Sequence, residues 1–254
     1  MTAPLDSRKT GSVIGAPIDV LGWDQAVARL AAWAGERRSR VVFICSAHSV
    51  VTARQDPAFG QALRAADMAT PDGAPVAWML RCLGHAGQQR INGPDLMWRC
   101  CADAAARGTS IYLYGSAPAT LVLLQQRLLA AFPALRIAGV SSPPFRALTA
   151  DEDAAEVAVI NASGAGLVWV GLGCPKQEMW MHAHRGRVHA LMVGVGAAFD
   201  YHAGRVLRAP PWAQRAGLEW MYRLASEPRR LWRRYLVSNT LFVLAAARQL
   251  LGWR

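Results

Sequence analysis

Residues Val170 to Met181 have the sequence Val-Gly-Leu-Gly-Cys-Pro-Lys-Gln-Glu-Met-Trp-Met. They continue the apolar run 167–170, whose β-branched and aromatic residues are typical of a buried strand. Gly171 and Gly173 allow the backbone to approach a ligand closely, and Pro175 suits the first turn of a helix. The stretch therefore predicts a buried strand, a glycine turn and a helix in direct succession.

The beginning of that helix is a candidate anion site, because the first N–H groups of a helix have no partners within it. Lys176 adds a positive charge there, and Gln177 can donate to an oxygen or accept from a hydroxyl. We expect a phosphate-bearing ligand at this turn. A strand-to-helix turn without any ligand is the alternative.

Short apolar runs alternate with helical patterns along the chain. The expected strands are residues 41–45, 66–70, 110–114, 135–140, 167–170 and 190–195, and the clearest helices are residues 95–107, 118–131 and 151–161. Strands that alternate with helices pair in parallel through right-handed crossovers. The sequence thus predicts an α/β fold with a Rossmann-like open, mainly parallel sheet, whose ligands lie at the carboxyl ends of the strands.

The chain has 254 residues, of which 53% are hydrophobic, enough for one substantial core. We expect a core of residues 1–207 and a basic, aromatic-rich helical appendage of residues 208–254. The formal net charge is +11, and much of the excess lies in Arg205, Arg208, Arg215, Arg223, Arg229, Arg230, Arg233 and Arg234. Such a cluster indicates phosphates, carried by a nucleic acid, an anionic membrane surface or a pyrophosphate ligand.

The five cysteines are odd in number and form no C-x-x-C pair, so neither a zinc site nor a disulfide framework is indicated. We expect reduced thiols in a cytoplasmic protein. The first nine residues contain no apolar stretch of signal-peptide length, and nothing directs export.

Asp72 is the carboxylate that we select as a general base. Pro71 and Gly73 hold it in a tight turn after an expected strand, and a base must above all reach the proton that it removes. The alternative is a helix N-cap, because a helix is expected from about Ala74. His48, after the first core strand, is a lower-ranked base, since a lone histidine more often packs or donates a hydrogen bond.

Other catalytic motifs are weak or absent. The sequence contains no G-x-S-x-G elbow, no P-loop and no G-x-G-x-x-G after its first strand. One D-x-D pattern, Asp151-Glu-Asp153, resembles a metal site of sugar transferases. Thr149 and Glu152 form a capping-box pattern there, however, which favours a structural role in the first turn of a helix. We expect no metal and no cofactor.

The C-terminal part interleaves arginines with aromatic residues. Arg223, Arg230 and Arg233 share one face if a helix continues past Pro228, and their guanidinium groups would suit a pyrophosphate. A solvated basic face or a nucleic-acid-binding helix is the alternative. An apolar stripe follows at helical spacing, in Leu236, Thr240, Val243, Leu244, Ala247, Leu250 and Leu251. It fits a helix lying in the plane of a membrane, or one packed on the protein's own core or on a second subunit.

Several separated motifs, taken in order, resemble the WecG/TagA/CpsF family of bacterial glycosyltransferases over nearly the full chain. They are Pro71-Asp-Gly73, Arg90-Ile-Asn-Gly-Pro-Asp-Leu96, Tyr112-Leu-Tyr-Gly115, Val170-Gly-Leu-Gly-Cys-Pro-Lys-Gln-Glu178, Val193-Gly-Val-Gly-Ala-Ala-Phe-Asp200, Arg208-Ala-Pro210, and Gly217-Leu-Glu-Trp-Met-Tyr-Arg223 with Glu227-Pro228. The resemblance implies a Rossmann-like domain with a membrane-associating C-terminal appendage, a GT-E type fold. It also implies metal-independent, inverting transfer of a sugar from a UDP-sugar to a polyprenyl-diphosphate-linked saccharide in cell-envelope or exopolysaccharide synthesis.

By this resemblance Asp72 is the base and Gln177 lies near donor and acceptor. Arg90 contacts a phosphate, and Asp200 contacts the nucleoside. The appendage arginines Arg223, Arg230 and Arg233 stabilise the departing UDP. The remaining expected substrate-binding residues are Ser46, His48, Asn92, Gly115, Phe145, Gly173, Lys176 and Arg208. The implied location is the inner face of the cell membrane, with an anionic membrane surface as a partner and a homo-oligomer as an option.

The chain departs from the family pattern at two places. Ser46-Ala-His48 replaces the usual Thr-x-Asn, and Ser141-Ser-Pro-Pro-Phe145 replaces a common Gly-Tyr, which leaves Phe145 as the candidate to stack on uracil. The expected donors therefore remain an N-acetylmannosamine type, glucose or glucuronate. A basic nucleic-acid-binding module is the rival class, although no nucleic acid is expected, and a Rossmann-like dehydrogenase is disfavoured by its missing glycine motif.

Overall fold

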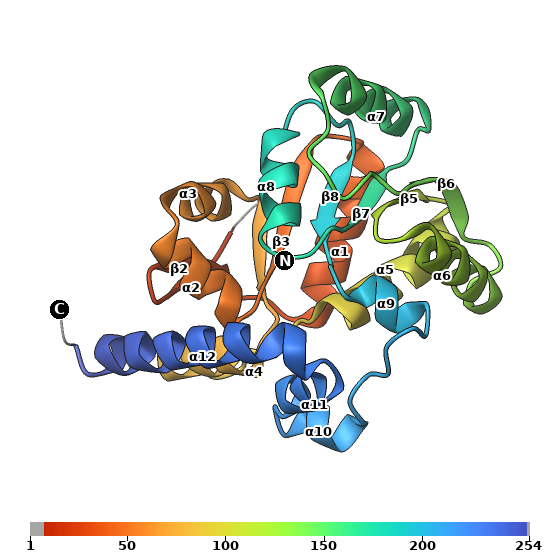
Figure 1. The fold of residues 1–254 in the computed structure, drawn as a ribbon. Helices are drawn as coiled ribbons and strands as arrows, with labels where there is room; N and C mark the ends of the chain where they lie inside the picture. Colours follow the sequence, from red (N-terminus) through yellow and green to blue (C-terminus); the bar gives the residue numbers. More distant parts are fainter. Residues whose placement is uncertain (1–7, 253–254) are drawn as a thin grey trace. The chain divides into compact units, whose positions relative to one another are not determined.

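The computed structural model describes residues 8–252, with the side chain of Arg230 excepted. Six strands form one sheet in the order β4-β3-β8-β7-β5-β6, and the pairs β3–β8, β8–β7, β7–β5 and β5–β6 are parallel (Figure 1). Helices flank this sheet. The Rossmann-like, mainly parallel α/β fold expected from the sequence is confirmed.

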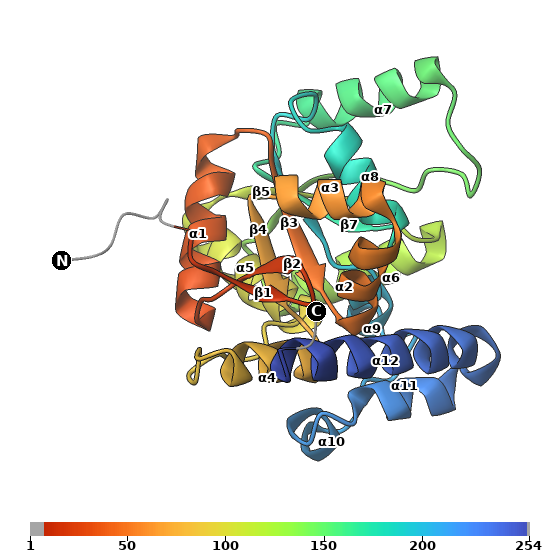
Figure 2. The same cartoon turned by 90° about the vertical axis from the view of Figure 1, so that its left-hand side faces the viewer.

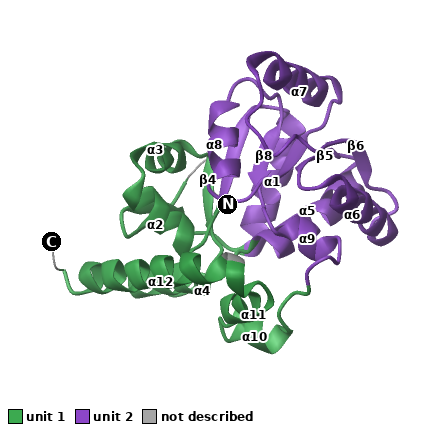
Figure 3. Cartoon of the chain, viewed as in Figure 1, with its two compact units in different colours: residues 1–22, 44–92, 207–254 green, residues 23–43, 93–206 purple. Residues whose placement is uncertain are grey.

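The chain forms two compact units (Figure 3). Unit 1 comprises residues 1–22, 44–92 and 207–254, and unit 2 comprises residues 23–43 and 93–206. The C-terminal segment thus belongs to the same unit as the segment that carries Asp72. The division into residues 1–207 and 208–254 stays a prediction.

Unit 2 contains most of the sheet. Its elements are α1 (Trp23–Glu36), the first part of β3 (Arg40–Cys45), α5 (Gly93–Arg107), β5 (Ser110–Gly115), α6 (Pro118–Ala131), β6 (Arg136–Ser141), α7 (Ala150–Ala162), β7 (Leu167–Gly171), α8 (Lys176–Ala183), β8 (Leu191–Gly194) and α9 (Ala198–His202). The first four residues of β7 are each at most 2% exposed, because both faces of a central parallel strand are covered.

Helices cover both faces of this part of the sheet. Trp169 of β7 points toward α5, where it lies beside Cys101 and lowers the pKa of that thiol, which burial raises. Tyr114 of β5 points to the other face and stacks on Trp180 of α8, with ring centroids 4.3 Å apart. Successive residues of a strand point to opposite faces, and Tyr114 is paired with Val170 rather than with Trp169. The strand register therefore assigns α5 and α8 to opposite sides.

Unit 1 contains a hairpin, the sheet edge strand and the C-terminal helices. Its elements are β1 (Thr10–Val13), β2 (Ala16–Asp19), α2 (Ala47–Gln55), α3 (Pro57–Ala65), β4 (Met68–Pro71), α4 (Ala74–Cys82), α10 (Pro211–Arg215), α11 (Glu219–Ser226) and α12 (Pro228–Leu250). The antiparallel β1–β2 hairpin was not expected from the sequence.

Helix α12 is held along its length within unit 1. It packs against α2 and runs beside α4 (Figure 2). One face, with Leu231, Ser238, Phe242 and Ala246, is buried. Near its end, the Gln249 amide donates to the Ser12 carbonyl at 2.6 Å and accepts from the Ile14 N–H at 2.7 Å. Among residues 8–252, no helix is both long enough and apolar enough to cross a bilayer.

Candidate active site

Asp72 lies directly after β4, at the carboxyl end of the strand. Its N–H donates to the Cys45 carbonyl at the end of β3, at 3.0 Å. Helix α4 begins two residues later with Gly73 as its N-cap, so Asp72 is not the capping residue that the sequence left open. The Asp72 side chain keeps 28% of its surface exposed, which leaves the carboxylate accessible to a substrate hydroxyl.

Arg90 lies beside Asp72 because the backbone brings the two loops together. The Ile91 N–H donates to the Pro71 carbonyl at 2.9 Å, and the Thr70 hydroxyl donates to the Ile91 carbonyl at 3.3 Å. The Arg90 Nε then donates to the main-chain carbonyl of Asp72, and its Nη2 lies 3.5 Å from Asp72 Oδ1. The expected neighbourhood of base and arginine is present within unit 1.

Glu219, the first residue of α11, joins this pair to a second arginine. Its Oε2 accepts from Arg90 Nη2 at 2.5 Å, and its Oε1 accepts from Arg208 Nε at 3.4 Å. Arg208 also donates from Nη2 to Asn92 Oδ1 at 3.2 Å. Sequence reasoning missed Glu219. The available signal was that Glu219 is the only acidic residue between Asp200 and Glu227, in a stretch rich in arginine.

The surroundings of Asp72 shift its acidity. Burial raises the pKa of the Asp72 carboxyl, Arg90 lowers it, Glu219 raises it and Arg223 lowers it, with a net upward shift. A carboxyl in a desolvated setting is a stronger base than a solvated one. Tyr235 of α12 belongs to the same surroundings, because Asp72 and Glu219 contribute to raising the pKa of its hydroxyl after burial, the main cause.

Ser46 and His48 have structural partners inside unit 1. Ser46 is the N-cap of α2, and its N–H donates to Ser49 Oγ at 3.2 Å. His48 Nδ1 is hydrogen-bonded to Ser238 Oγ at 2.9 Å, which ties α2 to α12. Burial, and then Arg234, lower the pKa of His48 to about 4, so the ring is neutral at pH 7. Their expected contacts with a substrate stay a prediction.

The single helix that would place Arg223, Arg230 and Arg233 on one face does not form. Helix α11 ends at Ser226, Glu227 has a φ of −133° and a ψ of 56°, outside the helical region, and Pro228 begins α12. A proline cannot continue the hydrogen-bond ladder of a preceding helix, so two helices form. Arg223 contributes to the pKa shift of Asp72, whereas Arg233 is exposed on α12 and the side chain of Arg230 lies outside the described residues.

In unit 2, the stretch after β7 forms the turn and helix expected from the sequence. Gly173 has a φ of +79°, a conformation that favours glycine. Helix α8 begins at Lys176, after Pro175. Gln177 is 4% exposed. Its Oε1 accepts from the Gly173 N–H at 3.1 Å, and its Nε2 donates to Glu178 Oε1 at 2.9 Å. The Gln177 side chain therefore stabilises the glycine turn through a hydrogen bond to its backbone.

The other candidates of unit 2 lie at or near strand ends. Gly115 ends β5 opposite Gly171 of β7, and a Cβ on Gly115 would stand 2.8 Å from the Gly171 carbonyl carbon. Lys176 is exposed, and Asp200 is half-buried on α9. Phe145, in the loop after β6, is 90% exposed. A planar ligand group stacking on Phe145 stays a prediction.

The acidic triplet of α7 has the structural role expected from the capping pattern. Thr149 and Glu152 form the capping box, and Glu152 pairs with Arg146. Asp153 pairs with His184 at 2.8 Å and with Arg187 at 2.7 Å. The part of the chain that the structure describes contains no group of three side chains that could hold a metal ion.

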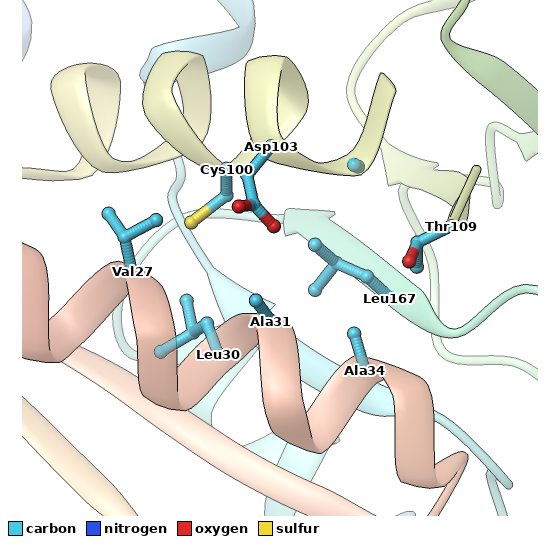
Figure 4. Close-up of a pocket in the computed structure, with 9 residues that line it drawn as sticks. Val27, Leu30, Ala31, Ala34, Cys100, Asp103, Thr109 and Leu167 are labelled. Carbon is cyan, nitrogen blue, oxygen red and sulfur yellow. The ribbon is translucent and has the colours of Figure 1, made fainter. Parts of the chain in front are cut away.

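A small crevice of unit 2 lies between α1 and α5 (Figure 4). It has a volume of about 10 Å³ and is lined by apolar side chains such as Leu30 and Leu167. A single water needs about this much space, so the crevice is a packing gap rather than a substrate site.

A mainly parallel α/β sheet with glycine turns at its strand ends defines a Rossmann-like protein, and a carboxylate set among arginines is the arrangement expected of an enzyme that acts on phosphate-bearing ligands. The model of the "Glycosyl transferase WecG/TagA/CpsF family" matches residues 11–254. The chain belongs to this family and is a glycosyltransferase.

One similar protein is the N-acetylglucosaminyldiphosphoundecaprenol N-acetyl-beta-D-mannosaminyltransferase of Bacillus spizizenii. The two are 36% identical over 203 residues, which cover 78% of this chain and 76% of that protein.

Proposed function

We propose that this glycosyltransferase moves an N-acetylmannosamine residue from a UDP-sugar to a polyprenyl-diphosphate-linked N-acetylglucosamine, with inversion and without a metal. The observation that carries the proposal is the position of the Asp72 carboxyl, which follows β4 and lies with Oδ1 3.5 Å from Arg90 Nη2. Burial raises the pKa of this carboxyl, Arg90 lowers it, Glu219 raises it and Arg223 lowers it. This is the environment of a general base next to cations that suit a phosphate.

In the proposed reaction the acceptor hydroxyl oxygen attacks the anomeric carbon in one displacement. The bond from that carbon to the β-phosphate oxygen breaks, and the hydroxyl proton passes to Asp72. UDP leaves with the bonding electrons, so negative charge grows on its β-phosphate. Arginines preorganised near this charge stabilise the transition state more than the ground state. We propose Arg90, Arg208 and Arg223 of unit 1 for this role, and the roles implied for Arg230 and Arg233 stay predictions.

The name of the relative supports this donor sugar, and the two altered motifs leave other donors open. The Bacillus spizizenii protein is named for N-acetyl-beta-D-mannosaminyl transfer. His48 stands where the family usually has an amide, and its Nδ1 is engaged by Ser238. The His48 side chain thus has a structural partner in α12, and glucose and glucuronate remain the alternative donors that the assay compares.

The glycine turns of unit 2 are proposed to bind the donor. A φ of +79° at Gly173 and the buried amide of Gln177 preorganise the backbone before α8, and N–H groups at such a turn suit phosphate oxygens. Asp200 and Phe145 are the proposed nucleoside contacts.

Helix α12 is proposed to bind the inner face of the cell membrane. Its outward face carries Trp232, Leu236, Val243 and Leu244, each more than half exposed, while Arg229 and Arg233 are exposed at its beginning. An apolar stripe next to arginines is typical of a helix that lies in an anionic lipid surface. This location would bring the enzyme to a lipid-linked acceptor.

A direct assay tests the proposal. The purified full chain is incubated with N-acetylglucosaminyl-diphosphoundecaprenol and, in parallel, with UDP-N-acetylmannosamine, UDP-glucose or UDP-glucuronate, with and without EDTA. We expect a β-linked disaccharide lipid from the first donor at a rate that EDTA changes less than about twofold. Transfer from another donor only would contradict the sugar assignment, a loss of rate in EDTA would contradict metal independence, and no transfer from any donor would contradict the proposed reaction.

A further inference from the structure

We infer that Glu219 is a positioning residue that holds Arg90 and Arg208 in place and keeps Arg90 from closing on the base Asp72. The inference rests on the function proposed above.

The geometry gives Glu219 one oxygen for each arginine. Arg90 Nη2 is 2.5 Å from Oε2, and Arg208 Nε is 3.4 Å from Oε1. The Glu219 side chain is only 14% exposed, so water screens these interactions less than at a free surface. One carboxylate thus joins Arg90, from the loop after α4, to Arg208, from the segment before α10.

The distances at Arg90 show which carboxylate its guanidinium prefers. Its Nη2 lies 2.5 Å from Glu219 but 3.5 Å from Asp72 Oδ1. A closer ion pair with Asp72 than the present one at 3.5 Å would further stabilise the carboxylate form and weaken it as a base. Because Glu219 holds the same nitrogen closer, Arg90 lies beside the base but is kept from a close ion pair with it.

The charge of Glu219 also keeps Asp72 a stronger base, because it raises the pKa of the Asp72 carboxyl. The charged and titratable groups that face Asp72 are Arg90 from the loop after α4, Glu219 and Arg223 from α11, and Tyr235 from α12. After burial, the charge of Glu219 contributes to the upward shift of the Asp72 pKa. Removal of that charge lowers the pKa directly, and it also releases Arg90 toward Asp72.

The test is the pH profile of kcat/KM for transfer by the full chain, because its acid limb reports the base of the free enzyme. Glu219→Gln is expected to lower kcat/KM at pH 7 by about tenfold or more and to move the acid limb down by about one pH unit. Glu219→Asp keeps the charge but shortens the side chain, so a smaller shift in the same direction is expected.

Glu36→Gln is the matched control. Glu36 pairs with Arg40 at 3.1 Å on the surface of α1, so the same substitution breaks one arginine pair and should leave both rate and acid limb unchanged. An unmoved acid limb in Glu219→Gln would overturn the inference, even if the rate fell, because a merely structural role lowers the rate without moving the limb. If Glu219→Gln does not fold, the acid limb of Glu219→Asp decides in the same way.

A second readout separates this inference from the proposed function. Carbon NMR of the Asp72 carboxyl reports its titration without turnover, and its pKa should fall in Glu219→Gln. A wild-type chain that transfers no sugar would contradict the proposed function alone. A wild-type chain that is active, with the same Asp72 titration in both proteins, would contradict the role of Glu219 alone.

Discussion

Arg90 donates from Nε to the main-chain carbonyl of Asp72, while its Nη2 lies 3.5 Å from the carboxylate of the same residue. The arginine is therefore anchored to the backbone of the base and makes only a long contact with its side chain. This arrangement keeps the Arg90 guanidinium next to Asp72 without a tight ion pair. The carboxylate can then act as a base while the cation is close enough to contact a phosphate.

Asp72→Asn tests the base. The amide keeps the shape of the side chain but cannot accept the acceptor's proton, so kcat should fall by about a thousandfold. Calorimetric affinity for UDP should change by less than about threefold. Asp24→Asn, at an exposed position of α1, is the control and should leave kcat unchanged. Transfer by Asp72→Asn near the parent rate would rule out Asp72 as the base.

Arg223→Ala should act on the pH profile in the opposite direction to Glu219→Gln. Arg223 lowers the pKa of Asp72, so its removal raises that pKa and moves the acid limb of kcat/KM to higher pH. As the pH falls, activity is then lost at a higher pH than in the wild type. We also expect kcat/KM at pH 7 to fall by about a hundredfold, because a cation near the leaving phosphate is removed.

Arg38→Ala is the control for this experiment, since Arg38 is exposed in the loop between α1 and β3. It should change neither kcat/KM at pH 7 nor the position of the acid limb of the pH profile. A limb that moves down in Arg223→Ala, or that does not move, would contradict the placement of Arg223 beside Asp72.

His48→Asn tests the link between α2 and α12. The pKa of His48 is about 4 in the folded protein, below its ordinary value of 6.5, so the unfolded chain binds a proton first as the pH falls. The contribution of the neutral His48 ring to the free energy of unfolding is fully present above pH 6.5 and is lost as the pH falls toward 4. Between pH 7 and pH 5, urea unfolding should show a loss of about 1 kcal/mol, reduced from the full linkage value because part of the ring meets solvent.

Asparagine does not titrate, so His48→Asn should lack this part of the pH dependence. His189→Asn, at an exposed position, should retain it. Equal pH dependence in His48→Asn and the wild type would contradict a buried, neutral His48.

Gln177→Leu tests the support of the glycine turn. Leucine leaves the Gly173 N–H without the acceptor at 3.1 Å and Glu178 Oε1 without the donor at 2.9 Å. The free energy of unfolding should fall by about 2 kcal/mol, the usual cost of disrupting buried polar groups, and KM for the donor should rise. Gln125→Leu removes a half-buried glutamine of α6 and should leave KM unchanged, and an unchanged KM in Gln177→Leu would argue against donor binding at this turn.

Leu244→Glu tests the membrane face of α12. Leu244 is 56% exposed, so a glutamate is tolerated by the fold but disfavoured in an anionic lipid surface. Sedimentation with vesicles of phosphatidylglycerol should fall by about fivefold or more. Val159→Glu on α7, also at a residue 56% exposed, is the matched control. Equal vesicle binding of both variants would contradict the proposed face.

The local patterns predicted most of the parallel sheet. Continuous apolar runs such as that of β7 can be buried only in the middle of a sheet, and the helices between them require parallel pairing. The expected helix 118–131 coincides with α6. The β1–β2 hairpin escaped prediction because its strands are only four residues long and lack a clear alternating pattern.

The sequence by itself determined the α/β fold, the glycine turn before Gln177 and the position of Asp72 after a strand, because these depend on neighbours along the chain. Only the tertiary structure decided that Glu219 stands between Arg90 and Arg208, and that Ser238 holds His48. Glu219 and Arg90 are separated by 129 residues, and Ser238 and His48 by 190. Such contacts arise from the packing of distant segments within unit 1, and no local periodicity encodes which charged side chains will meet there.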